Sequence, residues 1–544
     1  MKADGLKLRA SVIFFIFLAL YFIIVLNLYY IQIYQADFFN QLGLQQYHVT
    51  QTKTPARALI YDRSGQPLAI NQDCLSAFIL PKQLKSRETL EKFLQTHFPH
   101  AYAQLQEKSN KQFMYIKRNL SQAQQELIAT SAIPDIQLLH EPHRFYTTTT
   151  TAPIIGITDI DNKGLFGIEL QYNSLIAGVQ TIFCLDKDAR SGFFHFKKET
   201  TNEGKEGTPI HLTIDSNLQF LVEEAVKDAV QKFKATEGCA LVINPKNGEI
   251  LAMVTYPHFD PNDTIPADLE LTKNKIVTEA YELGSVMKTF VALAALQEGV
   301  VTADELIDCK NLKTTYIDGR KINTWAPHGT IPFTEVIARS NNIGIAIIAK
   351  RLGETLFDHY MRIGFSKKTG ITFPGESKGF VNPPHQWSKQ SIISLSYGYE
   401  ISATLLQLAS SFCMIANDGY AITPTLILSQ NNKPTDKQLY ATEHIHTLKN
   451  ILTSGTNYGT SRRAHIEGYR IMCKTGTANM LINGQYQNDQ NLFTCAGIVE
   501  KDTYQRVIVT FVKQAHGENL FASTVAAPLF ERVAQRVIIN DKVI

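Results

Sequence analysis

The sequence predicts a mixed α/β protein in three parts: one N-terminal membrane helix, a mixed α+β module, and a large α/β domain. Three observations support this prediction. An apolar run begins at residue 12, and strand-like and helical segments follow it. Beyond a polar stretch at 197–207, strands lie toward both ends of the remaining segment with helices between them. A chain of 544 residues is long enough for a large core beside a smaller module.

The first predicted element is the membrane helix. Residues 12–31 are apolar apart from Asn27, and about 20 such residues span the hydrocarbon core of a bilayer. Basic residues precede the run and none follows until Lys53, so the positive-inside rule places the N-terminus in the cytoplasm and the remainder outside. The preceding basic residues are Lys2, Lys7 and Arg9.

A cleaved signal peptide and a buried core helix are the alternatives for this run. A signal peptide has a shorter apolar stretch that ends in small residues, whereas this run ends in the bulky residues Tyr29, Tyr30 and Ile31. The length and the basic flank argue against a core helix. We therefore predict a cytoplasmic tail at 1–9 and a single-pass anchor at 10–31 in the cytoplasmic (inner) membrane, with everything after it periplasmic or extracytoplasmic.

A mixed module is expected over residues 32–205. Its elements are predicted from apolar spacing, capping residues and turn residues. They are a strand at 57–63 that turns at Ser64-Gly65, helices at 88–98 and 121–130 with Ser121 as an N-cap, an exposed strand or loop at 147–151, and a linker at 197–207.

The region 206–544 is predicted to be one α/β domain whose sheet is assembled from both ends of the segment. Alternation and turn chemistry predict the hairpin at its start. The expected elements are a strand at 210–214, a helix at 217–232 capped by Asp215, a hairpin of 239–243 with 250–255, helices at 285–299 and 334–352, strands at 469–474, 492–499 and 506–512, and a helix at 526–537.

The first chemical motif is Ser285-Val-Met-Lys288 at a predicted helix start. Residues i and i+3 share one face of a helix, so the lysine amine can reach the serine hydroxyl. Serine is a weak nucleophile that needs an adjacent base, and burial or a second cation makes a lysine neutral enough to serve. Chance is the alternative, although Ser-x-x-Lys occurs only here in the chain.

Two further motifs follow in the sequence. Ser340-Asn341-Asn342 precedes an apolar helix, and its simpler interpretation is a helix N-cap. Lys474-Thr475-Gly476-Thr477 ends a predicted strand, and its simpler interpretation is an ordinary strand end. Two decoys exist: Ser429-Gln-Asn431 in a polar loop, and Lys368-Thr369-Gly370 in a turn.

The ordered set of these three motifs resembles the penicillin-recognising acyl-serine enzymes. The resemblance extends to the flanks, namely Gly238–Asn262 before the serine, and Arg57–Ala69 with Gly164–Glu169 in the module. Because no glycosyltransferase domain fits before the acylating domain, the chain resembles the class B penicillin-binding proteins. Residues 396–409 resemble the septal (division) form more than the elongation form. The family fold implied is an antiparallel sheet flanked by helices, preceded by a non-catalytic pedestal or dimerisation-type module.

The resemblance implies a peptidoglycan D,D-transpeptidase that β-lactams inhibit. Ser285 would attack the stem peptide, Lys288 would accept its proton, and Ser340 would pass a proton to the leaving D-Ala while Lys474 polarises that relay. Backbone N–H groups of Ser285 and Thr477 would form the oxyanion hole. The substrate-binding residues would be Asn342, Thr475, Gly476 and Thr477.

The resemblance also implies the binding partners: D-Ala-D-Ala stem peptides, penicillin and other β-lactams, a polytopic glycosyltransferase of the SEDS family, and division-complex proteins. A formal charge of only +3 gives no reason to expect nucleic acid. No cofactor or metal is expected, because proline interrupts both His-x-x-His pairs, His97/His100 and His140/His143. The seven scattered cysteines argue against a disulfide framework, although a single disulfide stays possible.

Three alternative functions remain open at this stage. The first is an elongation-type transpeptidase, and the second is a carboxypeptidase or β-lactamase-like hydrolase, which needs an extra base for deacylation. The third is a catalytically silent assembly protein or β-lactam sensor, against which the intact motif set argues.

Overall fold

The computed structural model describes residues 2–107, 111, 113–187, 194–263, 266–428, 433–435 and 437–543. The chain forms two compact units: Met1–Arg57 with Ala177–Gly207, and Ala58–Ile176 with Thr208–Ile544. Each unit therefore combines two separate stretches of sequence. The decoy motif Ser429-Gln-Asn431 lies outside the described residues.

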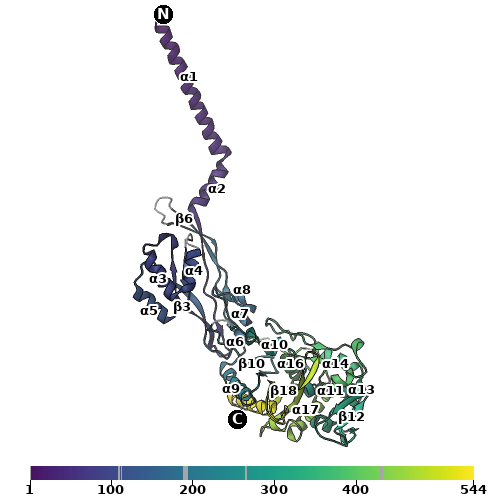
Figure 1. Cartoon of the computed structure of the whole chain (residues 1–544). Coiled ribbons are helices and arrows are strands. Elements are labelled where there is room, and N and C mark those ends of the chain that lie inside the picture. Colours follow the sequence, from purple (N-terminus) through teal and green to yellow (C-terminus); the bar gives the residue numbers. More distant parts are fainter. Residues whose placement is uncertain are drawn as a thin grey trace. The chain divides into compact units, whose positions relative to one another are not determined.

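The first unit begins with a long apolar helix, drawn in purple in Figure 1. Helix α1 (Lys2–Tyr29) continues through a π-helical turn at Tyr30–Tyr34. The stretch Gly5–Tyr34 has a mean hydropathy of 2.7, and none of its most apolar window is buried in the protein. This helix is long and apolar enough to cross a membrane, as the anchor prediction requires, and an N-terminal signal sequence would pass the same test.

A three-stranded antiparallel sheet completes the first unit, in the order β1-β6-β7. The linker predicted at 197–207 is wrong for residues 197–202, which belong to β7 and pair with β6. Polar side chains do not prevent pairing, because the ladder is made by the backbone. The elements are α2 (Ala36–Tyr47), β1 (His48–Lys53), β6 (Thr181–Lys187) and β7 (Phe194–Asn202).

The module within the second unit is a five-stranded sheet with helices. Its strands run in the order β4-β3-β2-β8, with β5 also paired to β3. Ser121 caps α5 through a capping box with Gln124, as predicted, whereas Thr150 and Thr151 are buried and not exposed. The elements are β2 (Ile60–Tyr61), β3 (Pro67–Ile79), α3 (Arg87–His97), α4 (Pro99–Glu107), β4 (Met114–Lys117), α5 (Gln122–Ser131), β5 (Gln137–Tyr146), α6 (Ala152–Ile155), α7 (Gly167–Gln171), α8 (Asn173–Ala177) and β8 (Ile210–His211).

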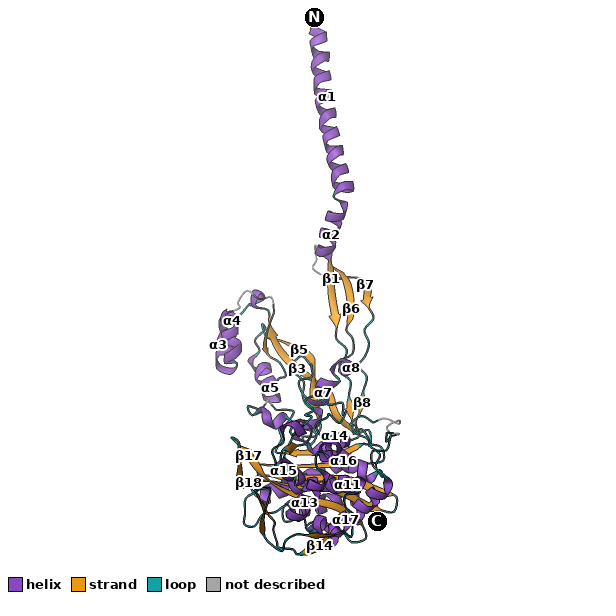
Figure 2. Ribbon diagram, turned by 90° about the vertical axis from the view of Figure 1, so that its right-hand side faces the viewer, coloured by secondary structure: helices purple, strands orange, loops and turns teal. Residues whose placement is uncertain are grey.

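The large domain is built on one five-stranded antiparallel sheet in the order β10-β9-β19-β18-β17. The sheet therefore joins the two ends of the segment, as predicted, because β9 pairs with both β10 and β19. Figure 2 shows β17 and β18 side by side. The strands are β9 (Glu237–Ile243), β10 (Ile250–Tyr256), β17 (Arg470–Ile482), β18 (Gln485–Lys501) and β19 (Tyr504–Lys513).

Two layers of helices bury the two faces of this sheet. Along β9, Leu241 packs into the larger core with α11, while its neighbours Ala240 and Val242 pack into a second core with α9 and α18. This is the period-two alternation of a strand that is buried on both faces. The helices are α9 (Ser216–Lys232), whose N-cap is Asp215 as predicted, α11 (Lys288–Gln297), α16 (Leu405–Ala416), α17 (Thr442–Asn457) and α18 (Ala526–Asn540).

The helix predicted at 334–352 is two helices with a break at residues 339–341. These are α12 (Phe333–Ala338) and α13 (Asn342–Leu352), and the break contains Ser340 with φ +55°. The remaining elements are α10 (Lys275–Thr278), β11 (Leu306–Asp308), β12 (Thr314–Ile317), β13 (Arg320–Asn323), β14 (Thr330–Pro332), α14 (Thr355–Ile363), β15 (Phe380–Val381), α15 (Ser391–Ser396) and β16 (Ile401–Ser402).

The cysteines are thiols wherever their side chains are described. Five of them are buried and Cys74 is half-buried, so they pack as small apolar residues. The buried ones are Cys239, Cys309, Cys413, Cys473 and Cys495.

Candidate active site

Ser285 lies in a tight 3-10 turn, Gly284–Met287, which leads directly into α11. Gly284 has φ +60°, and a side chain there would place its Cβ only 2.5 Å from the carbonyl oxygen of Thr477. Only glycine fits such a close approach with a positive φ. The turn that carries Ser285 is therefore held against strand β17.

The side chain of Ser285 is half-buried. Among the residues that the structure describes, none forms a hydrogen bond with Ser285 Oγ, and Lys288 Nζ is bonded elsewhere. Catalytic hydrogen bonds often tighten only when substrate is bound. Proton transfer from Ser285 to Lys288 therefore stays a prediction.

Lys288 is completely buried at the start of α11. Its Nζ donates to the backbone oxygen of Ser340 at 2.7 Å, to Asn342 Oδ1 at 2.5 Å and to Ser340 Oγ at 3.2 Å. Burial lowers the pKa of Lys288 well below its usual value, and the positive charge of Lys474 acts in the same direction. These two causes leave more of the amine neutral, and so able to accept a proton, than in a solvated lysine.

Ser340 occupies the break between α12 and α13 with a left-handed backbone. Such a conformation costs a non-glycine residue about 1–3 kcal/mol and persists where the surroundings impose it. The next residue, Asn341, caps α13 by accepting from the N–H of Gly344 at 2.8 Å. The motif is thus both a helix cap, which was its simpler interpretation, and the element that presents the Ser340 hydroxyl.

Lys474 lies on β17 and is 2% exposed. Its Nζ donates to Ser340 Oγ at 3.0 Å and to the backbone oxygen of Thr475 at 3.0 Å. Burial lowers the pKa of Lys474 to about 8. The hydroxyl of Ser340 therefore lies between two buried amines, those of Lys288 and Lys474.

The predicted substrate-binding residues have partners of their own. Asn342 uses both ends of its amide, because Oδ1 accepts from Lys288 and Nδ2 donates to the carbonyl of Asn323 at 2.5 Å. Thr475 Oγ1 donates to Thr460 Oγ1 at 3.2 Å. Thr477 Oγ1 accepts from the N–H of Ala522 at 2.9 Å, which leaves its own proton available for donation.

Gly476 lets β17 approach the nucleophile turn. A Cβ at this position would lie 2.3 Å from the carbonyl oxygen of Leu283 and 2.8 Å from the backbone N of Val286. Real Cβ atoms do not make contacts this short, so any other residue would push the strand and the turn apart. The glycine of the Lys-Thr-Gly motif is thus explained by packing.

The structure brings the three motifs together. Lys288, Ser340, Asn342 and Lys474 are joined by hydrogen bonds, and the Ser285 turn packs on Gly476 and Thr477. The decoy Lys368-Thr369-Gly370 lies in an irregular segment, as predicted. In the described regions no group of three or more His, Cys, Asp or Glu side chains is placed to hold a metal ion.

Sequence reasoning missed the loop around Thr460. The N–H of Thr460 donates to the carbonyl of Ala338 at 3.0 Å, and Ser461 Oγ donates to the carbonyl of Cys473 at 3.2 Å. The loop thus fastens the end of α12 to β17 beside Ser340 and Lys474. No motif marks Thr460, because its role depends on long-range packing.

Comparison with known proteins gives two family matches. Residues 238–535 match the model of the penicillin binding protein transpeptidase domain, and residues 52–212 match that of the penicillin-binding protein dimerisation domain.

Relatives match over most of the chain. The chain is 28% identical to the probable peptidoglycan D,D-transpeptidase PbpC of Pseudomonas aeruginosa, over 93% of this chain and 90% of that protein. It is 27% identical to the peptidoglycan D,D-transpeptidase FtsI of Escherichia coli, over 92% and 86%. The crystal structure of penicillin binding protein 3 from Mycobacterium tuberculosis is similar with a TM-score of 0.69 and 25% identity, over 91% of this chain and 98% of that one.

Proposed function

The chain belongs to the family of penicillin-binding protein transpeptidases, and on that basis we propose that it cross-links peptidoglycan through an acyl-enzyme on Ser285. The observation that carries the proposal is the position of the Ser340 hydroxyl, 3.2 Å from Lys288 Nζ and 3.0 Å from Lys474 Nζ, beside the turn that holds Ser285. A hydroxyl shared between two buried amines can relay a proton in either direction.

Acylation is the first half of the proposed reaction. Ser285 Oγ attacks the carbonyl of the penultimate D-Ala, and its proton passes to Lys288 Nζ. The oxyanion is held by the backbone N–H groups of Ser285 and Thr477, since donors aimed at developing charge lower the barrier most. When the C–N bond breaks, the proton returns through Ser340 Oγ to the departing D-Ala amine, and an ester on Ser285 remains.

Substrate binding uses the residues around this relay. The hydroxyls of Thr475 and Thr477, in the positive field of Lys474, bind the terminal carboxylate of the donor peptide. Gly476 keeps the strand close to the nucleophile turn, and the amide of Asn342 binds a peptide amide once substrate displaces one of its present partners.

Transfer is the second half of the reaction. The amine of a second stem peptide attacks the ester carbonyl, its proton passes to the same relay, and Ser285 regains its own proton as it leaves. The product is a new amide cross-link, so no external oxidant or cofactor is consumed. Penicillin enters the same site, and its opened ring stays on Ser285.

The proposed setting is the septum of a dividing cell. A single-pass anchor at 10–31 holds the protein in the inner membrane with the tail 1–9 in the cytoplasm, and the module at 32–205 and the catalytic region at 206–544 lie outside. The similarity to FtsI of Escherichia coli supports the division role. A polytopic glycosyltransferase that supplies glycan strands and other division proteins are the proposed partners.

Labelling with a fluorescent penicillin tests the proposal. The full-length protein in detergent should form a covalent adduct, and mass spectrometry of the digested protein should place it on Ser285. Ser285→Ala should form none while it unfolds at the same temperature as the wild type. In live cells the label should collect at the septum. An adduct on another residue, or normal cross-linking by Ser285→Ala, would reject the proposed function.

A further inference from the structure

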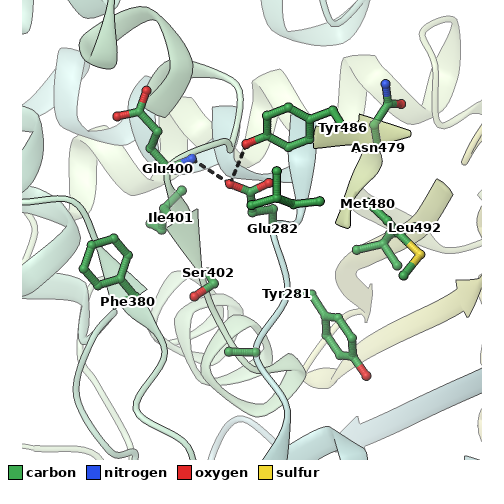
Figure 3. A pocket seen from close by; sticks show the side chains of 12 residues that line it. Tyr281, Glu282, Phe380, Glu400, Ile401, Ser402, Asn479, Met480, Tyr486 and Leu492 are labelled. Atoms are coloured by element: carbon green, nitrogen blue, oxygen red, sulfur yellow. Dashed lines mark hydrogen bonds between the residues drawn. The ribbon is translucent and has the colours of Figure 1, made fainter. Parts of the chain in front are cut away.

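Glu282, three residues before Ser285, connects separate segments around the nucleophile turn (Figure 3). Its Oε1 accepts from the backbone N–H of Glu400 at 2.8 Å and from the hydroxyl of Tyr486 at 3.1 Å. Tyr486 lies on β18, in the hairpin that continues from the Lys474–Thr477 strand. One carboxylate oxygen thus ties the turn to two other parts of the domain.

The segment that contains Glu400 also touches the nucleophile turn directly. Gly398 has φ +90°, and a Cβ there would lie 2.2 Å from the carbonyl oxygen of Gly284. Tyr281 and Ala403 exchange two backbone hydrogen bonds of 2.9 Å each. Residues 281–284 are therefore packed along residues 398–403.

A second contact joins this segment to β17. The hydroxyl of Tyr399 accepts from the backbone N–H of Asn479 at 3.2 Å, and its ring packs edge-on against Tyr486 with centroids 4.9 Å apart. Asn479 is two residues beyond Thr477 on the same strand. The nucleophile turn, residues 398–403 and the β17–β18 hairpin thus meet around the carboxylate of Glu282.

This junction is not densely packed. A cavity of about 460 Å³ borders Glu282, Glu400, Asn479 and Tyr486, and most of the other side chains in its wall are apolar. A junction beside a cavity depends more on its hydrogen bonds than a filled core does, because fewer protein atoms contact it.

The second carboxylate oxygen of Glu282 is buried and has no hydrogen-bond partner among the described residues. Burial raises the pKa of Glu282, the bonds from Glu400 N–H and Tyr486 oppose this, and the negative charge of Glu400 adds to the rise. The neutral acid and the anion both offer Oε1 as an acceptor. The arrangement therefore calls for an acceptor oxygen at this point rather than for a charge.

We propose that Glu282 is a positioning residue for acylation, whose Oε1 holds the Ser285 turn in register with the Lys474–Thr477 strand through Glu400 N–H and Tyr486. The inference rests on the proposed role of Ser285. Errors of about 1 Å in the position of a reacting group lower rates by about a hundredfold, so a junction outside the reacting groups can control the acylation step.

Three variants separate the acceptor role from charge and from bulk stability. Glu282→Gln keeps the acceptor oxygen and should acylate within about twofold of the wild type. Glu282→Met has a similar volume without an acceptor and should acylate about 10- to 100-fold more slowly. Tyr486→Phe removes one donor and should acylate about threefold to tenfold more slowly. Stopped-flow acylation with a fluorescent penicillin measures all three.

In the slower variants the first-order rate constant of acylation should decrease while the dissociation constant of penicillin stays unchanged. This is expected because the turn is displaced while Thr475 and Thr477 remain in place. Adding Tyr486→Phe to Glu282→Met should cause no further loss, since both remove the same contact. Tyr504→Phe is the matched control, because that hydroxyl bonds Asp541 at 3.0 Å and Tyr504 belongs to β19, which is not adjacent to β17.

An acylation rate of Glu282→Met equal to that of the wild type would overturn the proposal. If the Met variant does not fold, the same result for Tyr486→Phe would overturn it. Independent, multiplicative losses in the double variant would also overturn it. If Ser285 is not the nucleophile, the wild type itself forms no adduct at this position, so failure of the proposed function has a distinct result.

Discussion

The hydroxyl of Ser340 lies 3.0 Å from Nζ of Lys474, although 134 residues separate them in the chain. Ser340 reaches this position because α12 ends before it and α13 begins after it. Lys474 reaches it because β17, which carries this residue, is the edge strand of the central sheet. Lys474 is buried, so desolvation shapes its acid–base behaviour, which gives the first prediction.

The acylation rate should fall as the pH rises through about 8. Burial lowers the pKa of Lys474 to about 8, and in the proposed mechanism its positive charge holds the substrate carboxylate. Deprotonation removes that charge, so the alkaline limb of the rate should follow this group. Lys288 acts in the opposite sense, since it accepts a proton only when neutral, and its lowered pKa allows this at a lower pH than for a solvated lysine. Penicillin acylation from about pH 6 to about pH 10 measures the profile.

Lys474→Arg provides the control for this assignment. Arginine remains charged far above this range, so the alkaline limb should vanish even though the planar guanidinium fits the site less well and the plateau rate drops. An unchanged alkaline midpoint in Lys474→Arg would assign the limb to another group.

Gly476→Ala should separate the strand from the nucleophile turn. The added Cβ would lie 2.3 Å from the carbonyl oxygen of Leu283, so the backbone must move. We expect acylation to slow by about a hundredfold, as for other misplaced reacting groups. Gly329→Ala is the matched control, because no atom lies within 4 Å of its added Cβ and its φ is not positive. Equal acylation rates for the two variants would contradict the packing argument.

Much of the large domain was predictable from local sequence signals. Asp215 and Ser121 are caps that the side-chain chemistry indicates, and the hairpin of β9 and β10 follows from alternation around a Pro-Lys-Asn-Gly turn. These signals act over a few residues. The order of the three motifs predicted which side chains meet, because that order reflects a known arrangement rather than any local preference.

Long-range pairing was not predictable in the same way. Residues 197–202 are polar, yet they form β7 because β6 supplies the backbone partners. Thr150 and Thr151 are buried by their surroundings, despite a sequence typical of an exposed segment. The break at Ser340 lies inside an apolar pattern that favours one helix. Each result depends on contacts with residues that are far away in the sequence, and a short stretch of sequence does not reveal such contacts.

The lifetime of the penicillin adduct should be hours rather than seconds. Hydrolysis of the Ser285 ester needs a base that activates water. The described hydrogen bonds of Lys288 and Lys474 go only to hydroxyl, amide and carbonyl groups, and those of Ser340 Oγ come from these two amines, so no carboxylate is among the partners. A half-life of about an hour corresponds to a barrier of about 22 kcal/mol, and a half-life of about a second to about 18 kcal/mol. The ratio of the two half-lives, about 3,600, lies within the contribution of a positioned general base, about 10²- to 10⁴-fold.

Intact-protein mass spectrometry after removal of free penicillin measures this decay directly. The transpeptidase interpretation requires that the mass of the penicillin adduct persists. It also requires that, when a thioester donor replaces penicillin, the ester formed on Ser285 transfers to an added amine acceptor. Loss of the adduct within seconds would instead identify a hydrolase on the same scaffold. A stable adduct without amine transfer would favour a β-lactam sensor, because acylation alone is then the function that the buried amines around Ser340 support.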